Sequence, residues 1–210
     1  FKQHLEDTFN LDIQKTHSQL IEDLVDRYGT GRGIYRNTRH AVKGFPSRLL
    51  HCIELEAADE FNAKVQWLVQ WLDLQPKKEK HLLICHELET VLAIEKVLWE
   101  QKGLSCAVFH EQMSLIERDR SAAFFADDQQ GSRIMLCSEI GSEGRNFQFC
   151  HNLICFDLPD SPDLLEQRIG RLDRIGQQKD VNIWFPVLEN SLESAQLHWF
   201  DQALNCIKQC

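Results

Sequence analysis

The chain carries three arginines at every third position in the run from Gln167 to Gln177, namely Arg168, Arg171 and Arg174. Residues three apart share roughly one face of a helix, so this spacing predicts a cluster of guanidinium groups. Such a cluster favours phosphate binding, because like charges repel one another unless they face anions. The alternative is a surface ion-pair network with Glu166 and Asp173, in which each pair contributes little. The glycines of the run favour phosphate binding, since a plain surface helix avoids glycine.

A second candidate site is the run from Ser138 to Asn146, in which Gly141 and Gly144 flank Ser142-Glu143. Glycines let a ligand approach the backbone closely, and the terminal Ser and Asn add short polar side chains. A glycine-containing turn with solvated ends is the alternative.

Short apolar runs alternate with helical periodicity, and these elements must position the candidate residues. The predicted strands are 81–85, 106–109, 133–137, 153–156 and 181–185, and the predicted helices are 61–72, 88–98, 114–125, a helix carrying Leu164, Leu165 and Ile169, and 192–207. This alternation predicts a parallel, doubly wound α/β sheet. Ligands of such sheets bind beyond the carboxyl ends of the strands, where His86, His110 and Ser138 fall.

Residues 1–50 differ from the rest of the chain. Residues 10–28 form an amphipathic stretch, and residues 32–48 contain five bases and no acid. We predict a helical segment and basic linker over 1–50 and the α/β domain over 51–210. The linker either holds a phosphate backbone or is a solvated connector.

The composition excludes several classes of protein. The 210 residues are 43% hydrophobic and 26% charged, which predicts a folded core rather than disorder. No apolar run is long enough for a membrane helix, and no signal peptide is expected. The net charge of −9 argues against a wholly basic nucleic-acid binder but allows a local basic face. None of the eight cysteines forms a C-x-x-C motif, which argues against a metal site and disulfides, and several of them (Cys85, Cys137 and Cys155) lie in apolar runs, which predicts core packing.

Several catalytic motifs are missing. No G-x-x-x-x-G-K-[ST] phosphate loop occurs, and residues 29–33 lack its Lys-Ser/Thr ending. Asp59-Glu60 follows no apolar strand, which makes it a poor magnesium site. No Ser/His/Asp arrangement is apparent. The chain opens with Phe1 rather than Met, so we expect a piece of a longer protein that is not a complete nucleotide hydrolase on its own.

Four runs of the chain resemble motifs of the superfamily 2 helicases, in the order of that family. The run 81–87 resembles motif IV, 109–119 the block that follows it, 138–147 motif V, and 167–177 motif VI. The ending Arg174-Ile175-Gly176-Gln177 is typical of the Snf2 branch. The runs 36–46 and 141–149 are similar to the bacterial RNA polymerase-associated ATPases of that branch.

The resemblance implies the second RecA-like lobe of a two-lobe motor that binds ATP between its lobes, with Mg²⁺ held by the first lobe. It implies that Arg171 and Arg174 are catalytic arginine fingers. The implied cofactor-binding residues are Gly141, Glu143, Gly144, Asn146, Gln167 and Arg168. The implied nucleic-acid contacts are Ser138, His86, His110, Arg36, Arg39 and Lys43.

The implied function is ATP-dependent translocation on double-stranded DNA that remodels or recycles RNA polymerase in the bacterial cytoplasm, at the nucleoid. The implied partners are the first lobe of the same protein, duplex DNA and RNA polymerase. Two departures from the family stand out: Arg145 replaces a small apolar residue, and Asp173 often corresponds to His. The run 48–61 is also short for this branch, which puts a partner-binding insertion in doubt. A non-catalytic protein-docking module and an RNA helicase lobe remain alternatives.

Overall fold

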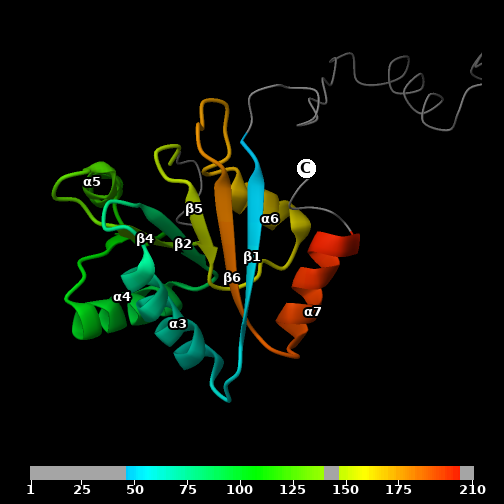
Figure 1. Cartoon of the computed structure of the whole chain (residues 1–210). Helices are drawn as coiled ribbons and strands as arrows, with labels where there is room; N and C mark the ends of the chain where they lie inside the picture. The colour runs from blue at the N-terminus through cyan, green and yellow to red at the C-terminus, as the bar shows by residue number, and fades with distance from the viewer. Residues whose placement is uncertain (1–45, 140–146, 204–210) are drawn as a thin grey trace, which may run out of the picture. The chain divides into compact units, whose positions relative to one another are not determined.

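A computed structural model describes residues 46–139 and 147–203, which all belong to one compact unit of the chain (Figure 1). Its elements are β1 (Arg48–Leu55), α3 (Glu60–Leu74), β2 (His81–Cys85), α4 (Leu88–Lys102), β3 (Ala107–Phe109), α5 (Leu115–Ala126), β4 (Ile134–Ser138), β5 (Asn152–Cys155), α6 (Pro162–Ile169), β6 (Val181–Leu188), α7 (Leu192–His198) and a π-helical turn (Trp199–Ala203).

The six strands form one parallel sheet in the order β1-β6-β5-β2-β4-β3. Every residue of β2, β4 and β5 is buried, as expected for strands covered on both faces. Because all strands are parallel, their carboxyl ends meet at one edge of the sheet. The predicted parallel α/β fold is confirmed.

Apolar side chains fill a core on each face of the sheet. Successive residues of a strand point to opposite faces, so Leu82 belongs to one core and Leu83 to the other. Helices α3 and α4 contribute Leu68 and Ile94 to the Leu83 core, whereas α5, α6 and α7 supply the Leu82 core. Both faces therefore carry helices, which is the doubly wound arrangement. Within the described ranges, no helix is both long and apolar enough to cross a membrane.

The first strand, β1, was missed by the sequence pattern. Among the described strands it pairs with β6 alone, at the edge of the sheet, and its exposed residues include Leu49, Cys52 and Glu54. An edge strand lacks the continuous apolar run that marked the central strands. Asp59-Glu60 thus follows a strand, although not the continuously apolar one whose absence the sequence analysis noted. Asp59 caps α3 instead, accepting a hydrogen bond from the Asn62 amide at 3.0 Å.

Two further expectations concern the helices and the cysteines. The predicted helix 192–207 is α7 only as far as His198, where the π-helical turn begins; residues 204–207 lie outside the described residues. Cys85, Cys137 and Cys155 are free thiols within the core, as predicted. Burial raises the pKa of Cys155 to about 11, so this thiol stays protonated at neutral pH.

Candidate functional site

Helix α6 begins and ends where its capping residues dictate. Ser161 accepts a hydrogen bond from the Leu164 amide at 3.3 Å, and Pro162 occupies the first turn, where its missing N–H costs nothing. The helix ends at Ile169, and Gly170 opens a series of turns. Only Arg168 therefore lies on the helix. The prediction that all three arginines share one helical face is wrong, because the chain leaves the helix before Arg171.

Arg168 is buried, with 1% of its surface exposed. Its Nε donates to Glu139 Oε2 at 3.0 Å, and its Nη1 donates to the Asp157 carbonyl at 2.5 Å. Burial lowers the pKa of Arg168, but the hydrogen bonds and charge of Glu139 outweigh burial and raise it overall. Arg168 thus fastens α6 to the ends of β4 and β5, and Glu139 balances its charge.

Residues 170–177, here called the arginine loop, follow α6. Gln177 is buried and anchors the loop: its Nε2 donates to the carbonyls of Gln148 and Cys150, each at 2.9 Å. Gly176 has φ +104°, a conformation that other residues rarely adopt. Arg174 is exposed, and its Nε donates to the Gly170 carbonyl at 2.9 Å. The loop therefore has a fixed base and an exposed guanidinium.

Arg171 is half-buried within the same loop, and its carbonyl accepts from the Phe147 amide at 3.1 Å. Phe147 is the last residue of the motif V run (138–147), so this hydrogen bond joins motif V to motif VI. The loop contacts the segment 147–150, which precedes β5, and it therefore lies toward the amino ends of the strands.

Asp173 is a buried residue of the loop and faces Arg48 at the start of β1. Arg48 Nε donates to Asp173 Oδ2 at 2.6 Å, while its two terminal nitrogens donate to Glu166, also at 2.6 Å. Burial lowers the pKa of Arg48, but Glu166 and then Asp173 outweigh burial and raise it overall. Asp173, which stands where the family often has His, is thus paired with Arg48.

The predicted nucleic-acid residues Ser138, His86 and His110 lie together at the carboxyl edge of the sheet. Cys85 is opposite Ser138 across the β2–β4 pair, and β3 adjoins β4, so the residues following these strands are neighbours. Ser138 is buried, and its Oγ donates to Glu111 Oε2 at 2.6 Å. That hydrogen bond is the main cause of the lowered pKa of Glu111.

Carboxylates surround His86 at this edge. Its amide donates to Asp157 Oδ2 at 2.8 Å, its Nδ1 lies 3.5 Å from Glu139, and its Nε2 lies 3.6 Å from Asp160. With Glu111, four acids line the edge. One of these acids, Glu139, is paired with the buried Arg168. Among the described residues, no group of three or more His, Cys, Asp or Glu is arranged to hold a metal ion.

The remaining predicted site residues are distributed as follows. Gln167 is exposed on α6. The predicted contacts Gly141, Glu143, Gly144, Asn146, Arg36, Arg39 and Lys43 lie outside the described residues. Sequence reasoning missed Glu139, Asp157 and Arg48 as members of the site. Glu139 directly follows β4, and Asp157 comes two residues after β5, which is a usable signal. The sequence around Arg48 carries no such signal.

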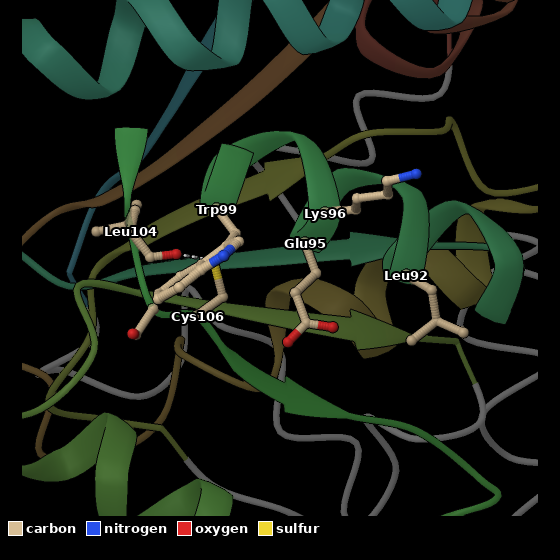
Figure 2. A pocket seen from close by; sticks show the side chains of 7 residues that line it. Leu92, Glu95, Lys96, Trp99, Leu104 and Cys106 are labelled. Atoms are coloured by element: carbon tan, nitrogen blue, oxygen red, sulfur yellow. Dashed lines mark hydrogen bonds between the residues drawn. The ribbon is translucent and has the colours of Figure 1, made fainter. Parts of the chain in front are cut away.

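A cavity of about 350 Å³ lies away from these residues, between α4 and the segment before β3. Figure 2 shows Leu92, Glu95 and Trp99 of α4 on one side and Leu104 and Cys106 on the other. Cys106 Sγ contacts the Leu104 carbonyl at 3.7 Å. No residue of the arginine loop lines this cavity, and neither do the four acids near His86.

A parallel α/β lobe with an arginine loop directly after α6 and polar residues at its carboxyl edge defines a class of protein, the RecA-like second lobes of helicases. The family model described as the helicase conserved C-terminal domain matches residues 63–176, and the chain belongs to this family. The predicted RecA-like fold is thereby confirmed.

Among curated proteins, the chain is similar to the RNA polymerase-associated protein RapA of Haemophilus influenzae strain PittEE. The two are 50% identical over 196 residues, which is 93% of this chain and 21% of that protein. RapA of Pseudomonas aeruginosa strain LESB58 is 45% identical over 225 residues, covering 91% of this chain and 24% of the relative. The chain therefore spans less than a quarter of the length of these relatives.

Solved structures agree on the fold. The C-terminal domain of the DEAD-box protein Dbp5 aligns with a TM-score of 0.61 at 18% identity, covering 78% of this chain and 87% of that one. The C-terminal part of the Fun30 ATPase domain aligns with a TM-score of 0.56 at 24% identity, covering 66% and 46%.

Proposed function

We propose that the chain is the second lobe of an ATP-driven, Snf2-like translocase that moves on duplex DNA and remodels or recycles RNA polymerase. The observation that carries this proposal is the arginine loop, with Arg174 exposed on a base held by Asp173 and Gln177. The similarity to RapA, whose name describes a polymerase-associated protein, supports RNA polymerase as the partner.

The donor set of the loop suits a nucleotide phosphate. A guanidinium presents planar donors that match phosphate oxygens, and its charge persists at any physiological pH. Arg171 and Arg174 would donate to the γ-phosphoryl oxygens as negative charge develops on them. ATP would supply the phosphoryl group, and Mg²⁺ would be held by the first lobe. Anchoring of the loop before the reaction keeps these donors in place, so little reorganisation is needed at the transition state.

The other motif residues have supporting roles in this proposal. Gly141, Glu143, Gly144 and Asn146 of motif V, together with Gln167, would line the nucleotide side of the lobe. Arg168 would act through Glu139, which it contacts, by fixing α6 against β4. The nucleotide would then be coupled to the lobe through α6 and the arginine loop.

Nucleic-acid contacts would lie at the carboxyl edge. Ser138 would reach a backbone phosphate only by exchanging its hydrogen bond to Glu111, and His86 and His110 would flank it. Arg36, Arg39 and Lys43 are proposed as further nucleic-acid contacts.

The test is DNA-stimulated ATP hydrolysis by the full-length protein carrying Arg174→Ala. Arginine fingers contribute about 10³–10⁵ in kcat in related systems, so we expect a fall of that order with KM for ATP little changed. Arg120→Ala removes an exposed arginine from α5 and is the matched control. Unchanged turnover would favour the protein-docking module, and stimulation by single-stranded RNA rather than duplex DNA would favour an RNA helicase.

A further inference from the structure

We propose that Arg48, at the start of β1, is a positioning residue that sets the arginine loop for catalysis. The inference rests on the proposed function, because it concerns how Arg171 and Arg174 are held rather than what they contact. Arg48 lies outside every helicase motif of the chain and more than 100 positions from the residues it binds.

Arg48 contacts one residue before the arginine loop, Glu166, and one near its middle, Asp173. Its terminal nitrogens donate to both carboxylate oxygens of Glu166, on the last turns of α6, and its Nε donates to Asp173, all at 2.6 Å. The side chains of Arg48 and Asp173 are 4% and 1% exposed. Arg171 lies between the two carboxylates in sequence, and Arg174 directly follows the second.

The residue before Arg48 holds the far end of the same segment. Ser47 donates its amide to Asp180 Oδ1 at 2.9 Å, and its carbonyl accepts from the Val181 amide at 2.8 Å. Residues 47 and 48 thus contact positions 166, 173, 180 and 181, which are spread along the segment joining α6 to β6. The start of β1 acts as a brace for that segment.

The position of the loop depends on contacts with other segments, because it has left the helix and its internal hydrogen bonds are turns between near neighbours. The segment 147–150 holds the loop from one direction, through the Arg171 carbonyl and Gln177, and Arg48 adds a separate contact through Asp173. Only a planar fork can bind Glu166 with two nitrogens and Asp173 with a third at once. Loss of the fork would let the loop shift, and a misplacement of about 1 Å typically costs about 10²-fold in rate.

The alternative is that Arg48 merely stabilises the lobe. Lys64 on α3 offers a matched control, because it is also a buried cation, 1% exposed, whose Nζ lies 2.7 Å from Glu193 and 2.7 Å from Glu60. Its carboxylate partners lie on α3 and α7, and its Nζ also donates to the Phe156 carbonyl at 2.9 Å; none of these residues belongs to the arginine loop. Removing either cation should lower the melting temperature, but only removal of Arg48 should slow the chemical step.

The experiment compares full-length Arg48→Met, Arg48→Lys and Lys64→Met with Arg174→Ala, using ATP and duplex DNA. We expect Arg48→Met to lower kcat about 10²-fold with KM for ATP little changed. Arg48→Lys keeps the buried charge but loses the fork, so it should recover the melting temperature more fully than kcat. Lys64→Met should lose melting temperature and keep kcat.

The outcomes separate the two proposals. Either of two results would show that the positioning role is wrong. In the first, the fall in kcat matches the fall in melting temperature to the same degree in the Arg48 and Lys64 variants. In the second, both Arg48 variants turn over like wild type while Arg174→Ala does not. If Arg174→Ala itself turns over like wild type, the arginine-finger proposal fails, and the role of Arg48 fails with it. If Arg48→Met does not fold, the split between melting temperature and kcat in Arg48→Lys decides.

Discussion

His81, at the start of β2, is a fully buried histidine held neutral by its surroundings. Its ring meets the edge of Trp71 with centroids 4.9 Å apart. Burial lowers the pKa of His81 to about 3, and the nearby Arg133 and His151 add to the effect. The unfolded chain, with a histidine pKa near 6.5, takes up this proton far more readily.

Stability should therefore depend on pH through His81. The part of the free energy of unfolding that depends on neutral His81 is fully present above about pH 6.5. It is lost as the pH falls from there toward about 3, by about 1.4 kcal/mol per pH unit. Urea unfolding of the chain at pH 7.5, 6 and 5 measures this loss. His81→Leu removes the titrating group and should flatten the profile; parallel profiles for the two proteins would contradict the assignment.

At the residue scale, the sequence predicted which residues share an edge of the sheet better than it predicted their hydrogen-bond partners. Ser138, His86 and His110 follow neighbouring strands, so their placement at one edge followed from topology alone. Two of the acids at that edge, Glu139 and Asp157, also come just after strands and could have been found in the same way, whereas the hydrogen bond of Ser138 to Glu111 depends on the packing of the loop after β3. Arg48 was recognisable only as a base, because Glu166 and Asp173 become its neighbours only when β1 pairs with β6.

Among the helices, α5 shows how a local signal fixes an element. Its start was predicted from Ser114 and Glu117, and the capping box is present: the Glu117 amide donates to Ser114 Oγ at 3.3 Å, and Glu117 accepts from the Ser114 amide at 2.7 Å. Such reciprocal bonds need only residues three apart, so tertiary packing cannot easily override them.

Ser114→Ala should destabilise the lobe by about 1 kcal/mol, since it removes an acceptor for one of the unpaired amides at the helix start. Chemical denaturation of the chain gives the value. Ser105→Ala, in the exposed connection before β3, is the matched control and should leave the unfolding midpoint nearly unchanged. An equal loss in both variants would mean that the cap contributes nothing.

Elements without a local signal were predicted less well. The central strands were found because both faces are buried and their sequences are continuously apolar. The edge strand β1 has one strand neighbour and alternates in exposure, so it resembled a linker. The end of α6 at Ile169 was missed because arginine spacing continues past it, although Gly170 marks the break.

At the scale of the molecule, the lobe supplies the arginines of the arginine loop, and its described residues include no group of His, Cys, Asp and Glu that could hold a metal ion. We expect the 210-residue chain alone to unfold cooperatively and to hydrolyse ATP no faster than buffer, because charge stabilisation by Arg171 and Arg174 needs a nucleotide held by another lobe. Phosphate release in the presence of duplex DNA is the measurement, with the full-length protein as the positive control. Turnover that survives in the isolated chain and disappears with Arg174→Ala would overturn the two-lobe arrangement.

The pairing of β1 with β6 also fixes an order of events during synthesis. Ser47 and Asp180, which bond across this pair, are 133 positions apart. At about 5–20 residues per second, the ribosome needs roughly 7–27 s to make the intervening chain. Until β6 has been made, β1 lacks its described strand partner, and the amide and carbonyl of Ser47 lack Asp180 and Val181. The brace of the arginine loop is therefore complete only after β6 has been made.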